Sequence, residues 1–183
     1  GYDLEVGITT TIECSIETEG SIVLNARLLC DILRRLPSQS VTINCDSHNL
    51  CKITSGEAEF SLVGIPANDY PELPTVSGGI PFTIKQGILK NMVKQTIFAV
   101  AVQDIKPVHK GIKFEVEDNN LRLISCDGFR LAIRNEAIEY SGENMTFVVP
   151  AKTLSEVVKL TDDDESNISF SIGKKFILAL RRN

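Results

Sequence analysis

An internal repeat constrains the fold of this chain more than any other feature. Val23-Leu24-Asn25-Ala26-Arg27 resembles Val148-Val149-Pro150-Ala151-Lys152, at an offset of 125 residues. A segment with helical spacing follows each run, and Asp3 faces Asp127 at an offset of 124. The alternative is chance similarity between two short αβ pieces. Because type, order and offset agree, the sequence predicts a recurring structural unit of about 125 residues.

The repeat also predicts that the chain holds about one and a half such units. Gly1 stands where Cys126 stands in the second copy, so the first copy lacks the opening of the second. The second copy stops near Leu180, without a counterpart of residues 57–74. We therefore expect the chain to be a piece of a longer protein.

Most apolar residues lie in short β-branched runs or alternate with polar residues, which is typical of strands. Val6, Ile8, Thr10, Ile12 and Cys14 share one face of such a segment. Strands are predicted over Val6–Ile16, Val41–Cys45, Leu50–Thr54, Ala58–Val63, Gly111–Glu117, Leu121–Ser125, Arg130–Ile138, Thr146–Val149, Ile168–Ile172 and Phe176–Leu180.

Three segments carry apolar residues at helical spacing instead: Asn25–Leu36, Ile84–Phe98 and Pro150–Leu160. Pro37 ends the first, and the third begins with a proline at a favoured helix start. Three amphipathic helices among about ten strands predict an α+β fold, in which helices cover one face of the sheets.

The segment Pro66–Pro81 holds four of the seven prolines and a Gly-Gly pair. Proline removes a backbone donor, so this segment cannot continue a helix or a central strand. It is predicted to be an extended connector between two domains.

The charge of the chain is unevenly distributed. The net charge is −5, which alone opposes nucleic-acid binding, yet the three predicted helices carry +2, +3 and +1. On the second helix, Gln86, Lys90, Asn91 and Lys94 lie opposite the apolar stripe. Basic helices on an acidic body suit the backbone of a polyanion, although each could be an ordinary solvated face. The helix candidates for phosphate contact are Arg27, Arg34, Lys90, Lys94, Lys152 and Lys159.

No catalytic, metal or cofactor site is predicted. His48 and His109 stand in no recognised motif, and the acidic run Asp162–Glu165 is interpreted as a solvated turn. The five cysteines show no C-x-x-C spacing and are interpreted as small buried residues in a reducing compartment. No apolar run approaches the roughly 20 residues that span a bilayer.

Five strings, in order along the chain, resemble the bacterial DNA polymerase III beta subunit family, the replicative sliding clamps. They are Gly1–Glu5, Leu62–Pro71, Phe98–Asp104, Asp127–Ala132 and Val149–Lys152. The resemblance implies repeated clamp domains with antiparallel sheets outside and helices lining a ring of two protomers. It implies that residues 1–79 are most of the first domain and 80–183 most of the second, with the start of the first, the end of the second and the whole third domain absent.

The resemblance also implies the function: a non-catalytic processivity factor that encircles duplex DNA in the cytoplasm, at the nucleoid. Its partners would be the polymerase III catalytic subunit, the clamp loader and repair polymerases, which bind through short peptides. Gln103, Pro107 and Val108 fall where family members touch DNA. The peptide pocket maps onto Lys106, His109, Cys126, Gly128, Phe129, Arg130 and Leu131.

Two other functions stay open at this point. A peptide-docking module that acts without DNA would fit the net charge of −5. A nucleotidyl transferase is suggested only by the association of the family with its polymerase. Salt-dependent DNA binding separates the clamp from the docking module, and turnover would identify an enzyme.

Overall fold

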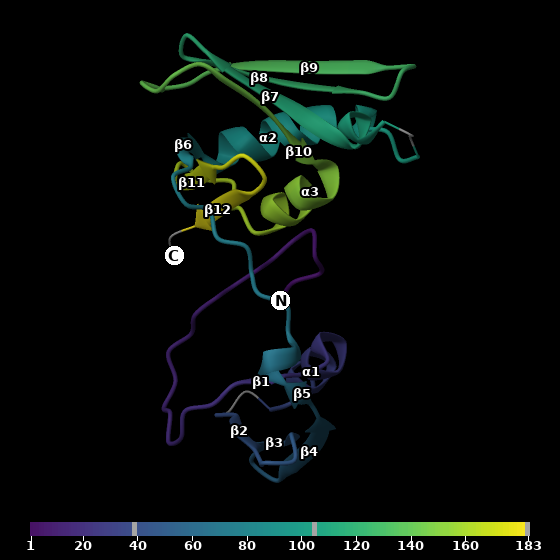
Figure 1. Cartoon of the computed structure of the whole chain (residues 1–183), viewed down its shortest axis with the longest axis vertical. Coiled ribbons are helices and arrows are strands. Elements are labelled where there is room, and N and C mark those ends of the chain that lie inside the picture. The colour runs from purple at the N-terminus through teal and green to yellow at the C-terminus, as the bar shows by residue number, and fades with distance from the viewer. Residues whose placement is uncertain (38–39, 104–105, 182–183) are drawn as a thin grey trace. The chain divides into compact units, whose positions relative to one another are not determined.

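The computed structural model describes residues 1–37, 40–103 and 106–181. Asp104, which ends one of the five family strings, lies outside the described residues. The chain divides into two compact units, Gly1–Leu73 and Pro74–Asn183 (Figure 1). Among the described residues, no helix is long and apolar enough to cross a membrane.

The second unit contains two antiparallel sheets with two helices. One sheet has the strand order β10-β7-β8-β9 and the other β12-β11-β6. The elements are β6 (Ile80–Lys85), α2 (Gln86–Thr96), the 3-10 turns η2 (Ile97–Ala99) and η3 (Pro107–Lys110), β7 (Gly111–Glu117), β8 (Asn120–Cys126), β9 (Leu131–Ala137), β10 (Met145–Pro150), α3 (Ala151–Lys159), β11 (Asn167–Ile172) and β12 (Ile177–Arg181).

The core of this unit lies between the four-stranded sheet and the helices. Every second side chain of β7 and β8 is buried, as the strand period predicts. Leu89, Met92 and Val93 of α2 and Leu154 of α3 are at most 1% exposed. These apolar faces hold both helices against one side of the sheet, and their polar faces are left for other contacts.

The first unit is smaller. A three-stranded antiparallel sheet has the order β2-β3-β4, and β1 pairs with β5. The elements are β1 (Ile22–Val23), α1 (Ala26–Leu33), β2 (Thr42–Cys45), β3 (Leu50–Ser55), β4 (Ala58–Val63), β5 (Ile65–Pro66) and η1 (Ala67–Asp69).

Helix α1 begins at an N-cap, because the Asn25 Oδ1 accepts from the Leu28 N–H at 3.1 Å. Its apolar stripe is only partly covered: Leu28 and Leu33 are 51% and 42% exposed. No residue of α1 is buried, whereas the corresponding helix α3 buries Leu154 completely. The helix was therefore correctly predicted, but the described first unit offers no second layer that covers its apolar face.

The repeat predicted from the sequence is visible in the order of the elements. In each unit a strand leads into a helix, and an antiparallel hairpin follows: β1, α1, β2 and β3 in the first, β10, α3, β11 and β12 in the second. The α+β class and the three helices are confirmed for the described part of the chain.

The repeated aspartates close the same kind of turn, as expected. Asp3 Oδ1 accepts from the N–H groups of Glu5 at 3.1 Å and Val6 at 2.7 Å. Asp127 Oδ1 accepts from the N–H groups two and three residues later, both at 3.0 Å. The residue after each aspartate has a positive φ, 73° at Leu4 and 90° at Gly128. Both aspartates thus have a structural role in a turn.

Two predictions about strands were wrong. Val6–Ile16 forms no strand: apart from a bridge between Tyr2 and Gly7, these residues pair with nothing in the described chain. Their counterpart in the second unit is β9, which pairs with β8 alone, and the described first unit has no strand in the place of β8. In addition, the strands β1, β5 and β6 were missed. β5 and β6 overlap the two ends of the predicted connector, and η1 lies within it. Residues 70–79 are irregular, as a connector should be.

The interpretation of the cysteines was also partly wrong. Cys45 and Cys51, directly opposite each other in β2 and β3, form a disulfide. Cys14 and Cys30 are exposed, and Cys126 is partly buried. Of the five, only Cys51 matches the expected burial.

Candidate nucleic-acid interface and partner loop

The two lysines that α2 places on its polar face have different surroundings. Lys94 is exposed and has no ion pair within the described residues. The Lys90 side chain is only 17% exposed, and its Nζ lies 3.0 Å from Asp163 Oδ2 and 3.1 Å from the Thr161 carbonyl oxygen. Lys94 is therefore the available cation of α2, while Lys90 already holds an internal partner.

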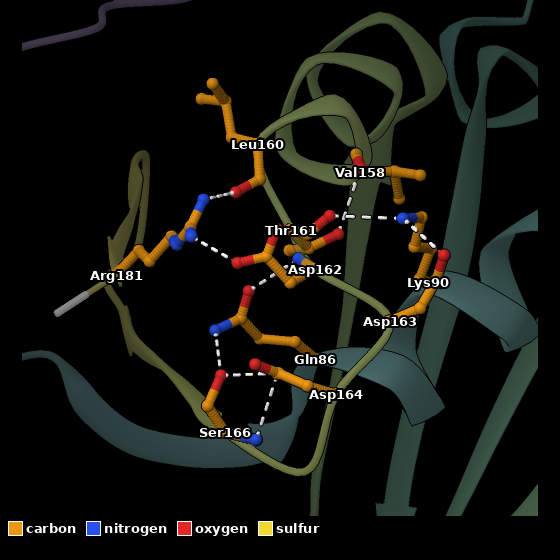
Figure 2. A network of polar contacts seen from close by, with 10 residues as sticks. All are labelled: Gln86, Lys90, Val158, Leu160, Thr161, Asp162, Asp163, Asp164, Ser166 and Arg181. Carbon is orange, nitrogen blue, oxygen red and sulfur yellow. Dashed lines mark hydrogen bonds and ion pairs between the residues drawn. The ribbon is translucent and has the colours of Figure 1, made fainter. Parts of the chain in front are cut away.

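The acidic run Asp162–Glu165 supplies this contact, and Figure 2 shows its first three residues, Asp162, Asp163 and Asp164. It is exposed, as expected of a turn, but its carboxylates are occupied. Arg181 pairs with Asp162 and also donates to the Leu160 carbonyl oxygen. The Asp164 Oδ1 accepts from the Ser166 hydroxyl at 2.6 Å, which holds the pKa of that carboxyl below its ordinary value. The turn is thus anchored to the fold and not merely solvated.

Gln86 belongs to the same network of hydrogen bonds and is buried, although the helical spacing predicted it on the exposed polar face. It is 1% exposed. Its Nε2 donates to the Ser166 hydroxyl at 2.6 Å, and its Oε1 accepts from the Asp162 N–H at 3.0 Å. The first N–H groups of α2, at Gln86 and Gly87, donate to the Ser166 and Asp164 carbonyl oxygens at 2.8 and 3.2 Å. The turn after α3 therefore caps the start of α2.

The candidate cations of α1 and α3 are more exposed than Lys90. Arg34 lies 3.8 Å from Asp31, and Lys159 lies 2.8 Å from Glu156, one helical turn away in each case. Both cations are more than 60% exposed, so these pairs hold them weakly. Arg27 and Lys152 are also exposed.

The predicted partner loop presents its aromatic residue to solvent. Phe129 is 100% exposed and follows Gly128 in the Asp127 turn. The Arg130 guanidinium lies 2.8 Å from Asp127 Oδ2 and 6.0 Å from the centre of the Phe98 ring. The N–H groups of Phe129 and Arg130 hold the pKa of the Asp127 carboxyl below its ordinary value. The exposed Phe129 side chain therefore belongs to a turn whose backbone is held by hydrogen bonds.

The segment Phe98–Ala101 connects this loop with the other predicted contacts. Its first residue lies under Arg130, and the Ala101 N–H donates to the His109 carbonyl oxygen at 2.9 Å. His109 belongs to η3 with Pro107 and Val108, and the latter is 61% exposed. Cys126 and Leu131 flank the turn at the facing ends of β8 and β9. Gln103 and Lys106 are exposed.

The described residues contain no group of three or more His, Cys, Asp or Glu side chains that could hold a metal ion. The surface thus offers scattered exposed cations on helices and an exposed aromatic residue on a turn. Such groups can contact phosphates and apolar side chains by attraction and burial.

Two family models cover the chain. Residues 1–74 match the N-terminal domain of the DNA polymerase III beta subunit, and residues 83–183 match its central domain. The chain belongs to the DNA polymerase III beta subunit family.

Named relatives and solved structures agree with this assignment. A beta sliding clamp of Halalkalibacterium halodurans is 34% identical over 194 aligned positions, which cover 100% of this chain and 51% of that protein. The structure of a beta subunit from Eubacterium rectale matches 99% of this chain and 50% of its own, with a TM-score of 0.94 and 33% identity. The sliding clamp of Bacillus subtilis matches with a TM-score of 0.86 and 34% identity, over 91% of this chain and 44% of its own. The chain spans about half the length of these relatives.

The family assignment confirms the predicted fold of sliding-clamp domains. The relatives carry the name beta sliding clamp, which agrees with the expectation that the chain is not an enzyme.

Sequence reasoning missed the roles of Gln86, Asp163 and Arg181. The sequence does contain a signal: four consecutive acidic residues, Asp162–Glu165, follow the basic helix predicted over Pro150–Leu160, and a second basic helix is predicted over Ile84–Phe98. Complementary charge could have suggested the ion pairs, but the paired residues are up to 80 positions apart in sequence.

Proposed function

We propose that the chain supplies the first and central domains, residues 1–79 and 80–183, of a processivity clamp for the bacterial replicative polymerase. As a homodimeric ring, the whole protein encircles duplex DNA in the cytoplasm, at the nucleoid. It tethers the polymerase III catalytic subunit, the clamp loader and repair polymerases. The observation that carries the proposal is the match of two successive domains of the family along one chain.

The exposed cations of the helices are the proposed DNA contacts. Arg27, Arg34, Lys94, Lys152 and Lys159 are exposed and basic, and Lys90 of α2 is a further proposed contact, although its side chain pairs with Asp163. Gln103, Pro107 and Val108 are proposed to extend this surface. Phosphate attraction reads no sequence, so a protein held in this way can slide along the duplex.

The partner site is proposed at the Asp127 turn and η3: Lys106, His109, Cys126, Gly128, Phe129, Arg130 and Leu131. Phe129, fully exposed on an ordered turn, would bury apolar surface when a partner peptide binds. The docking module without DNA remains the second candidate, favoured by the exposed Phe129 side chain and by the net charge of −5.

The test compares charge-neutralised variants in duplex DNA binding, followed by fluorescence anisotropy. Lys94→Gln and Arg27→Gln should each weaken binding of any duplex and reduce the salt slope by about 1. Lys174→Gln, which removes an exposed lysine from the turn between β11 and β12, is the matched control and should change the slope less. If all three variants bind like the parent chain while Phe129→Ala loses the polymerase catalytic subunit, the docking module is the better description.

A further inference from the structure

The turn after α3 brings negative charge to the polar face of α2. Asp162–Glu165 are four consecutive carboxylates, and cations from three separate elements reach them. Besides the pairs of Lys90 and Arg181 drawn in Figure 2, Lys85 pairs with Glu165, which raises the pKa of that lysine. The carboxylates of this turn therefore each pair with a particular cation of the second unit: Asp162 with Arg181, Asp163 with Lys90 and Glu165 with Lys85.

Lys90 is the cation among these that belongs to the proposed DNA face. It stands one helical turn before Lys94 on α2, and side chains at this spacing are neighbours. A phosphate bound at Lys94 would therefore come close to Lys90 and to its partner. The Asp163 side chain is 75% exposed and the Lys90 side chain 17%, so the carboxylate is far more accessible from the solvent than the lysine that it pairs with.

We propose that Asp163 competes with DNA phosphate for Lys90 and thereby lowers the affinity of the chain for duplex DNA. The inference rests on the proposed function, because it requires α2 to face the duplex. While Asp163 holds Lys90, it both withholds one cation and repels an approaching phosphate. When the pair opens, Asp163 is solvated at little cost, and Lys90 keeps its bond to the Thr161 carbonyl oxygen.

A double-mutant cycle tests this competition. The parent chain, Asp163→Asn, Lys90→Gln and the double variant are titrated with one labelled duplex at several salt concentrations. One additional phosphate contact steepens the salt slope by about 0.9, which corresponds to roughly tenfold tighter binding at about 50 mM salt. We expect Asp163→Asn to show this gain and Lys90→Gln to abolish it.

Two controls separate competition from a general effect of charge. Glu117→Gln removes one exposed carboxylate from the end of β7 and should change the affinity less than about twofold. The Asp163→Asn change in the Lys90→Gln background removes the same carboxylate without a lysine to release. Thermal unfolding of each variant verifies that the fold is kept.

The outcomes separate this inference from the proposed function. If the parent chain binds duplex in a salt-dependent manner and Asp163→Asn changes neither affinity nor slope, the competition is refuted and the DNA face stands. An equal gain with and without Lys90 also refutes it. If neither the parent chain nor Asp163→Asn binds duplex at low salt, both proposals fail. A gain that requires Lys90 supports both.

Discussion

At the scale of single residues, Asp127 determines the backbone conformation of the predicted partner loop. Asp127 accepts from the backbone N–H groups of Phe129 and Arg130 and pairs with the Arg130 side chain, so one carboxylate fixes Phe129 and the residue after it. Gly128 makes this possible, since its φ of 90° is a conformation that glycine adopts freely. The first unit uses the same turn with Leu4 in the glycine position.

Gly128→Ala should destabilise the turn by about 1–2 kcal/mol, because an L-residue there is strained. No atom lies within 4 Å of the position that its Cβ would occupy, so the cost is conformational and not steric. Chemical unfolding measures the loss. Gly20→Ala is the matched control, because its Cβ also meets open space and no positive φ is required there. Equal stability of the two variants would contradict the strained turn.

The Asp127 turn should also depend on pH in a defined direction. Its pKa is lowered in the folded chain, so the stabilisation is complete above the unfolded value of about 3.9 and is lost as pH falls through the folded pKa. The amide resonances of Phe129 and Arg130, followed by NMR, should shift with a midpoint below about 3.9. They should not titrate in Asp127→Asn. A midpoint at or above the unfolded value would contradict the turn geometry.

At the scale of elements, the notable feature is that α2 is capped from a distant part of the chain. Its N-cap residue, Lys85, makes no side-chain cap, and the carbonyl groups of Asp164 and Ser166 accept the first N–H groups instead. Gln86 ties the same turn to the helix from inside. Hydrogen bonds of the turn after α3 therefore join the end of α3 to the start of α2.

Gln86→Ala should cost about 1–3 kcal/mol of unfolding free energy, because it removes two hydrogen bonds in a partly buried place, one to the Ser166 hydroxyl and one from the Asp162 N–H. Gln95→Ala, on the exposed face of the same helix, should stay within about 0.5 kcal/mol of the parent chain. Denaturant unfolding measures both variants. Equal effects would mean that the buried amide adds nothing to the stability of the helix.

The sequence was sufficient where the signal is local and insufficient where the partner is distant. Periodicity located all three helices, although the first ends at Leu33, three residues before its predicted end at Leu36. The strand expected over Val6–Ile16 failed because alternation shows only that a strand is possible, while pairing requires a neighbour. Gln86 was misplaced because helical spacing cannot reveal a turn about 80 residues away that covers a polar face. The roles of the candidate-site residues stay predictions.

At the scale of the whole molecule, the distribution of charge reconciles a net charge of −5 with a proposed DNA-binding role. Part of the positive charge on the helices is already neutralised inside the protein, as the pair of Lys90 and Asp163 shows. Other cations of the helices, such as Arg27 and Lys94, remain exposed. Contacts between such cations and phosphates do not depend on the base sequence, which suits a protein that slides.

The chain is proposed to hold duplex DNA through phosphates without reading its sequence. The most direct test measures its affinity for two duplexes of equal length and unrelated sequence, from about 50 to 200 mM salt. We predict equal affinities for both, in the range of roughly 10⁻⁴–10⁻⁶ M, and a logarithm of affinity that falls linearly with the logarithm of salt by about 0.9 per contact. Affinities that differ between the two sequences, or that do not change with salt, would contradict the claim.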